Sequence, residues 1–187
     1  FGYLRRRINL TYALFGVLFF LSIPIIVKLS ISVYVDLGLI FFSTASLIAL
    51  LKWIDSGFRL KFLILSAICC GLAMGTKYNG LIVFFLLTFF VPFAHSRYSL
   101  EKNNNFLKAV SSGLYFFLIA LLIFSPWMIK NYIWTHNPIY PLYDHWFNPL
   151  NVTFQNSMSL FEIRSSIYNE SWWEIALLPV RIFFQGQ

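Results

Sequence analysis

The sequence is dominated by apolar runs of about 20 residues, the length that an α-helix needs to cross the hydrocarbon core of a bilayer. These runs cover roughly residues 9–30, 36–54, 60–76, 78–94 and 106–126. Hydrophobic residues make up 59% of the chain and charged residues only 11%, whereas about a quarter of the residues in a soluble domain are charged. The sequence therefore predicts an all-α, polytopic transmembrane helical bundle with about five spans, embedded in the lipid bilayer.

Two kinds of helix breaker divide the apolar runs. The segment "GLAMGTKYNG" interrupts the long run from Leu60 to Ala94 with three glycines and a lysine, so we expect two helices joined by a tight turn. Pro24 and Pro92 each remove an intrahelical hydrogen bond and should kink the first and fourth helices. The chain begins at Phe1 without a signal-peptide pattern, which we interpret as an internal piece of a longer protein.

The orientation follows from lysines and arginines, which concentrate in the cytoplasmic loops of membrane proteins. Nine of the fourteen cations fall at one set of helix ends. They are Arg5, Arg6, Arg7, Lys52, Arg59, Lys61, Arg97, Lys102 and Lys108. This set predicts the cytoplasmic face. The formal charge of +7 thus reflects membrane topology, and with no basic stripe we predict no nucleic-acid partner.

By the same rule, Asp36, the "TKYNG" turn and the chain after Pro126 share the extracytoplasmic face. We expect residues 1–126 to form the transmembrane region and residues 127–187 to form an extracytoplasmic loop with short interfacial helices. Its stretch "SPWMIKNYIWTHNPIYPLYDHWFNPL" is rich in tryptophan and tyrosine, which prefer the membrane–water interface. Such rings also stack on sugars. "SWWE", from Ser171 to Glu174, fits a capping box.

Three polar features of the outer face have competing interpretations. Asp36 is either an N-cap that satisfies free amide groups or a group with a chemical role. Lys77 either snorkels to the lipid headgroups or contacts a lipid phosphate. The spacing of His136, Asp144 and His145 matches no strong zinc pattern, which argues against a metal cluster there.

Three segments in order resemble a known family. They are "SISVYVDLGLIFFSTASLIALLKW", "GLAMGTKYNGLIVFFLL" and "PWMIKNYIWTHNPIYPLY". They are similar to the middle of bacterial polytopic glycosyltransferases of the dolichyl-phosphate-mannose protein mannosyltransferase superfamily, which includes aminoarabinose transferases and lipopolysaccharide-core galacturonosyltransferases. The resemblance runs from about Arg5 to Phe184.

The resemblance implies transfer of a sugar from a polyprenyl-phosphate carrier to a lipid, glycan or protein acceptor at the outer face of the cytoplasmic membrane. The transfer would be metal-dependent or metal-assisted, with an ion of open identity. Asp36 matches a family acidic residue, which implies a catalytic or metal-binding role, and Lys77 matches a lysine that faces the lipid-linked phosphate. Tyr78 is adjacent and is assigned to substrate binding. A family acidic residue of the first outer loop has no counterpart here, so we expect this piece to be inactive alone.

The chemistry agrees with this assignment. Displacing a polyprenyl phosphate from an anomeric carbon builds negative charge on the leaving group, which a lysine or a divalent ion stabilises. A polytopic transporter or a flippase for lipid-linked glycans remains the alternative. Transporters usually place their charges near mid-bilayer, whereas these helices carry almost none there.

Overall fold

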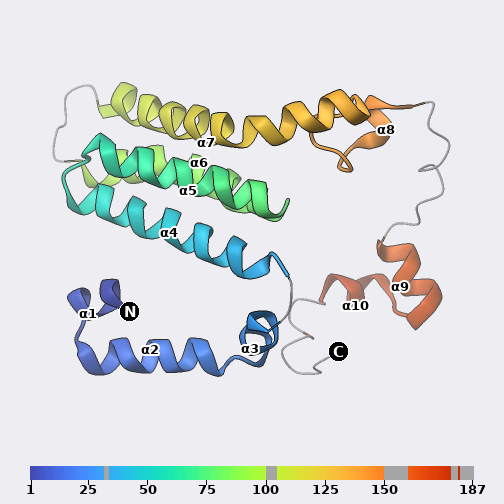
Figure 1. The fold of residues 1–187 in the computed structure, drawn as a ribbon, viewed down its shortest axis with the longest axis horizontal. Coiled ribbons are helices and arrows are strands. Elements are labelled where there is room, and N and C mark those ends of the chain that lie inside the picture. Colours follow the sequence, from blue (N-terminus) through green and yellow to red (C-terminus); the bar gives the residue numbers. More distant parts are fainter. Residues whose placement is uncertain (32–33, 100–104, 150–159, 178–180, 182–187) are drawn as a thin grey trace. The chain divides into compact units, whose positions relative to one another are not determined.

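The structure of the chain is a computed structural model that describes residues 1–31, 34–99, 105–149, 160–177 and 181. The described residues form helices and no strand (Figure 1). The helices are α1 (Gly2–Arg7), α2 (Leu10–Ser22), α3 (Pro24–Ser30), α4 (Asp36–Asp55), α5 (Leu60–Thr76), α6 (Gly80–Tyr98), α7 (Asn105–Thr135), α8 (Asp144–Phe147), α9 (Leu160–Tyr168) and α10 (Trp172–Ala176). The chain divides into two compact units, Phe1–Lys130 and Asn131–Gln187.

The helical membrane architecture predicted from the sequence is confirmed. Three described helices, α4, α6 and α7, are long and apolar enough to cross a bilayer, and α2 with α3 makes a fourth if the pair is one bent span. The remaining predicted run, 60–76, is the apolar helix α5, which has 17 residues. The count of three to four spans is roughly consistent with the predicted five.

The outer surfaces of these helices suit lipid. On α6, large apolar side chains recur every three or four residues and are more than 60% exposed: Ile82, Phe85, Leu86, Phe89 and Phe93. Side chains with this spacing form one stripe along a helix. In water such a stripe would be costly, but against acyl chains it needs no protein partner.

The helix boundaries follow the breakers in the sequence. Helices α2 and α3 are bent by 70° where Pro24 follows Ile23. Helix α5 ends at Thr76 and α6 begins at Gly80, so the "TKYNG" turn forms where it was predicted. Helix α7 runs on past the predicted end of its span at residue 126 and stops at Thr135.

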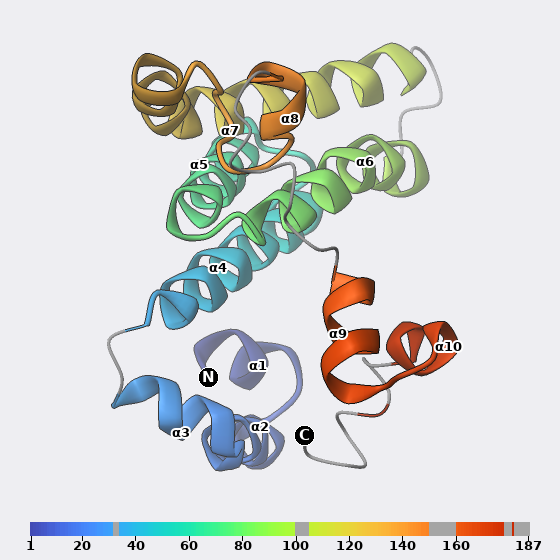
Figure 2. The ribbon, with the colours of Figure 1, turned by 90° about the vertical axis from the view of Figure 1, so that its right-hand side faces the viewer.

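The core of the first unit lies between α4, α5, α6 and the first part of α7, which lie side by side (Figures 1 and 2). Trp53, Leu63, Val91 and Phe116 are each at most 1% exposed and pack in one cluster. These large side chains come from all four helices, so the bundle is held by packing that involves every one of them.

Helices α4 and α5 are also joined by a reciprocal pair of serines. The Ser46 hydroxyl donates to the Ser66 carbonyl at 2.9 Å, and the Ser66 hydroxyl donates to the Ser46 carbonyl at 2.8 Å. Both side chains are fully buried. Small hydroxyl residues at a helix interface let the backbones approach and add hydrogen bonds worth roughly 0.6 kcal/mol each in a membrane.

Two glycines bring the start of α4 and the start of α6 onto the end of α5. A Cβ on Gly38 would lie 3.4 Å from the Thr76 methyl group, and a Cβ on Gly80 would lie 2.6 Å from the backbone of Ala73. Only glycine fits at the second position without displacing the turn. This close approach fixes residues 77–79 beside the first turn of α4.

The second unit is organised around the buried carboxylate of Asp144. Its Oδ1 accepts hydrogen bonds from the Asn137 amide at 3.2 Å and from the Asn148 amide at 2.7 Å. The Asn148 amide also donates to the Thr135 carbonyl at 2.8 Å. Asp144 therefore has a structural role that ties the end of α7 to α8.

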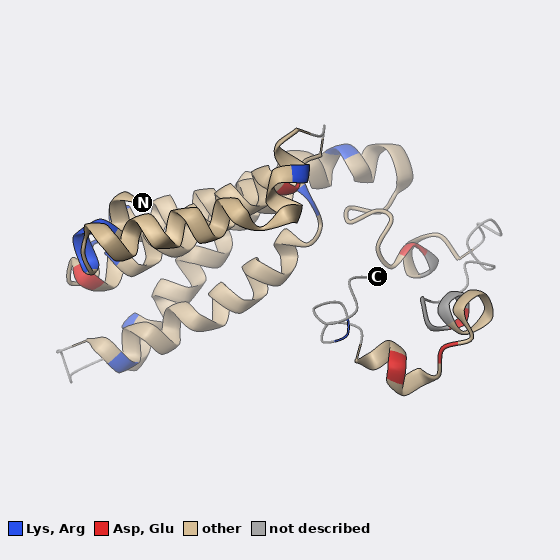
Figure 3. Cartoon of the chain, turned by 90° about the horizontal axis from the view of Figure 1, so that it is seen from below, with Lys and Arg blue, Asp and Glu red and all other residues tan. Residues whose placement is uncertain are grey.

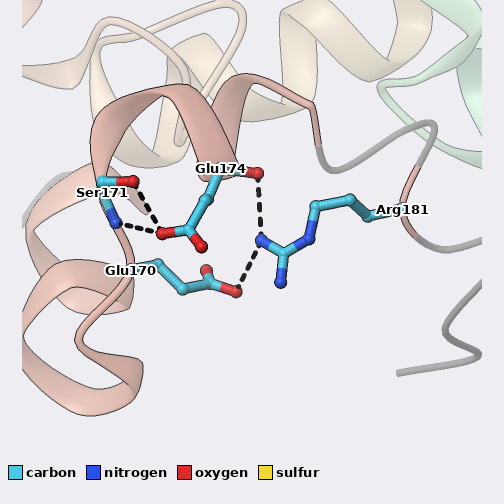
Figure 4. A network of polar contacts seen from close by, with 4 residues as sticks. All are labelled: Glu170, Ser171, Glu174 and Arg181. Carbon is cyan, nitrogen blue, oxygen red and sulfur yellow. Dashed lines mark hydrogen bonds and ion pairs between the residues drawn. The ribbon is translucent and has the colours of Figure 1, made fainter.

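The capping box predicted at the start of α10 is confirmed (Figure 4). The Ser171 backbone and hydroxyl both donate to the Glu174 carboxylate, at 2.8 and 2.6 Å. These two hydrogen bonds lower the pKa of Glu174, because they favour its charged form. Arg181 Nη1 lies 3.2 Å from both the Glu170 carboxylate and the Glu174 carbonyl.

The contact between α5 and α7 provides a test of the bundle. A Cβ on Gly71 would lie 2.6 Å from the Ile123 Cβ and 2.7 Å from the Ala120 carbonyl oxygen. We expect Gly71→Ala to lower the thermal unfolding temperature of the detergent-purified protein, since overpacking typically costs about 1–3 kcal/mol.

Gly75→Ala is the matched control, because a Cβ there meets nothing within 4 Å. It should leave the unfolding temperature unchanged or raise it, as alanine is the better helix former. Equal effects of the two variants would contradict the packing of α5 on α7.

Candidate functional site

Asp36 and Lys77, which the sequence assigned to one face of the membrane, form an ion pair. The Lys77 ammonium lies 2.6 Å from the Asp36 Oδ1. Asp36 is the first residue of α4, and Lys77 follows the last residue of α5. Other charged residues of the first unit also lie near helix ends (Figure 3). The middles of α4, α5 and α6 contain no charged residue.

The interpretation of Asp36 as an N-cap is wrong. Val35 occupies the N-cap position of α4, and no side chain makes a capping hydrogen bond there. Asp36 stands one residue further in, where its negative charge still favours the positive end of the helix dipole. Its hydrogen-bonding partner is Lys77, which follows the end of another helix.

The ion pair is accessible to solvent. The side chains of Lys77 and Asp36 are 41% and 26% exposed. A pair this exposed contributes only about 0–1 kcal/mol to stability, because water screens it and two side chains lose freedom. It can therefore open at little cost when a ligand competes for either partner.

A small cavity lies beside Lys77. It has a volume of about 240 Å³ and is lined by Met74, Gly75, Thr76, Lys77, Tyr78 and Trp127. Tyr78, which the sequence predicts to bind substrate, lies in the wall of this cavity. The cavity combines a cation with two aromatic rings that have polar edges, a composition suited to an anionic group attached to a sugar or a lipid.

Trp127 belongs to this site although sequence analysis treated it as part of the interfacial belt. Its indole N–H donates to the Tyr78 hydroxyl at 3.2 Å. The Lys130 ammonium lies 4.8 Å from the centre of the Trp127 ring, in range for a cation–π contact. The signal was present in "SPWMIKNY", where Trp127 and Lys130 are three residues apart and so share one helix face.

The described residues contain no cluster of metal-ligating side chains. Among them, no three His, Cys, Asp or Glu side chains gather closely enough to hold an ion. The one carboxylate at the candidate site is ion-paired with Lys77. The assignment of Asp36 as a metal ligand therefore stays a prediction.

Comparison with protein families places the chain. The family model of dolichyl-phosphate-mannose-protein mannosyltransferase (PMT) matches residues 1–137. The chain belongs to the PMT family. This confirms the resemblance that the sequence motifs indicated. Comparison with curated proteins and comparison with solved structures each gave no match.

Membership of the PMT family makes the chain a multi-pass membrane protein of the glycosyltransferase class. The PMT match includes every residue of the candidate site: Asp36, Lys77, Tyr78, Trp127 and Lys130. The site thus lies wholly inside the matched segment.

Proposed function

We propose that this PMT-family protein transfers a sugar from a polyprenyl-phosphate carrier to a lipid, glycan or protein acceptor on the extracytoplasmic face of the cytoplasmic membrane. The observation that carries the proposal is the pairing of Asp36 with Lys77 at 2.6 Å at the ends of two apolar helices. A lipid carrier holds its phosphate at the membrane surface, so the group that binds it must stand at a helix end. The family match favours transfer over the transporter or flippase alternative.

Lys77 is the proposed phosphate-binding residue. Its ammonium is 41% exposed and borders the cavity next to Tyr78 and Trp127. A phosphate that approaches it competes with a single carboxylate in a weak, solvent-accessible pair. As the bond between the anomeric carbon and the phosphate oxygen breaks, negative charge grows on the leaving phosphate, and the ammonium stabilises it.

Asp36 is the proposed catalytic carboxylate. Once Lys77 turns to the phosphate, the carboxylate oxygen is free to accept the proton of the acceptor hydroxyl as that oxygen attacks the anomeric carbon. The hydroxyl oxygen forms the new glycosidic bond, and the phosphate leaves with the electrons of the old bond. Tyr78 and Trp127 supply ring faces for the sugar.

Donor binding can be measured without knowing the sugar. We expect the wild-type protein in detergent to bind polyprenyl phosphate more tightly than the matching polyprenol, which lacks the phosphate. Lys77→Ala should weaken binding of polyprenyl phosphate by about 10-fold or more, since hydrogen bonds to charged groups contribute roughly 1.5–3 kcal/mol, and leave polyprenol binding unchanged.

Lys28→Ala is the matched control for Lys77→Ala. Lys28 is an exposed lysine in the last turn of α3 and lies on the same predicted face of the membrane. It should leave the preference for polyprenyl phosphate intact. If Lys77→Ala keeps the full preference, Lys77 only snorkels and the proposed phosphate site is wrong.

Measuring sugar transfer distinguishes a chemical role of the Asp36–Lys77 pair from a structural one. We expect Asp36→Asn in the full-length protein to reduce sugar transfer in membranes by about 100-fold or more, the usual scale for an acid–base group, with little change in unfolding temperature. The exchange of both residues, Asp36→Lys with Lys77→Asp, restores an ion pair but places each charge on the wrong helix. Activity of the exchanged protein near wild type would show that the pair is only structural.

The proposed face can be tested by cysteine labelling. In a background with Cys69 and Cys70 replaced, we expect a membrane-impermeant maleimide added to intact cells to label Asn79→Cys, in the turn between α5 and α6. It should not label Ser56→Cys, which follows α4 at its other end. The reverse pattern would place Asp36 and Lys77 on the cytoplasmic face and contradict the proposed reaction side.

A further inference from the structure

A second and larger cavity lies at the opposite end of α4 from the candidate active site. Its volume is about 540 Å³, within the usual range of about 300–1,000 Å³ for small-ligand sites. It lies where α4 ends at Asp55, beside the last turn of α6 and the first turn of α7. Nothing in the proposed transfer reaction uses this end of the bundle.

The wall of this cavity is formed by an unusual turn. After α4 the backbone enters the left-handed region at Gly57 (φ 70°) and again at Phe58 (φ 64°). A positive φ is uncommon at a large aromatic residue and implies local strain. The Phe58 N–H donates to the Trp53 carbonyl at 2.9 Å, which holds the turn closed.

The strained turn clamps a buried histidine at the cavity wall. The His95 ring lies 4.5 Å from the Phe58 ring, edge to face, and 5.8 Å from the Trp53 ring, nearly parallel to it. His95 is only 7% exposed. This packing holds the last turn of α6 against the turn after α4, next to Tyr98 and Ser99 in the cavity wall.

The charges around the cavity favour an anion. Among the residues that the structure describes, one cation, Lys108, and one acid, Asp55, line the cavity. The Asp55 carboxylate is already ion-paired with Arg7 of α1. The same helix ends carry further cations, and the described ones among them are Arg5, Arg6, Lys52, Arg59, Lys61 and Arg97.

We propose that this cavity binds a phosphate group at the membrane–water interface, with the headgroup of an anionic phospholipid as its main source. Lys108 and the Tyr98 hydroxyl are the donors to the phosphate oxygens. Ile54 and Phe58 give the cavity an apolar side that suits the glycerol and the first carbons of the acyl chains. Basic pockets between membrane helices bind anionic lipid headgroups in this way. The site is separate from the proposed donor site, which stands at the other end of α4.

Binding of lipids to the purified full-length protein, measured by native mass spectrometry, tests this site. We expect phosphatidylglycerol to bind about 10-fold more tightly than phosphatidylcholine, in line with the worth of a charge-assisted hydrogen bond. Glycerol 3-phosphate is the soluble probe. If it displaces phosphatidylglycerol completely, the cavity serves a free phosphate compound, and if it does not, the ligand is the lipid. Equal binding of the two lipids with no binding of glycerol 3-phosphate overturns the proposal.

One substitution that should weaken lipid binding and one that should strengthen it test whether the lipid binds in this cavity. Lys108→Gln should remove the preference for phosphatidylglycerol, whereas Lys61→Gln, which removes the same charge outside the cavity, should keep it. Asp55→Asn removes the acid of the cavity wall and should strengthen phosphatidylglycerol binding several-fold, a gain that a misfolded protein cannot produce. Equal losses in Lys108→Gln and Lys61→Gln, or no gain in Asp55→Asn, would assign the binding to general surface charge and contradict the site.

Discussion

The hydrocarbon core of the bilayer contains no water, and this determines which structures the chain can form there. Backbone groups there must bond within helices, and charged side chains are costly. The chain therefore forms apolar helices whose charges stand at their ends (Figure 3). A reaction that needs ionic groups can then occur only where helices end, and α4 has one such place at Asp36 and another at Asp55.

The two ends of α4 have different chemistry although each carries an ion pair. At one end Asp36 and Lys77 pair beside a small cavity with two aromatic side chains. At the other end Asp55 pairs with Arg7, beside a larger cavity lined by Lys108. The first end suits a reaction in which one phosphate is bound and released. The second suits a phosphate that stays, such as a lipid headgroup that anchors the bundle.

Much of the fold could be predicted because hydropathy and helix breakers decide it locally. The predicted run 60–76 coincides with α5, and the predicted turn after it forms between Thr76 and Gly80. The proximity of Asp36 to Lys77 was also within reach, since the distribution of cations puts both at the same helix ends. Their chemical roles remain predictions.

Other features depend on packing between helices and were not predictable from one sequence. Val35, and not Asp36, takes the N-cap position of α4. The close approach of α4 to the end of α5 at Gly38 brings Asp36 next to Lys77. Trp127 joins the site because α7 packs on α5 and sets its indole N–H against Tyr78. The positive φ of Phe58, in the wall of the second cavity, was not predictable because residues other than glycine rarely adopt it.

Lys77 is proposed to bind the phosphate of the lipid-linked donor. An experimental structure of the full-length protein with polyprenyl phosphate would show whether it does. We expect the phosphate oxygen within about 2.7–2.9 Å of the Lys77 ammonium, the distance of a charge-assisted hydrogen bond, with the Asp36–Lys77 pair opened. A phosphate bound elsewhere, with Lys77 still paired to Asp36, would contradict the account.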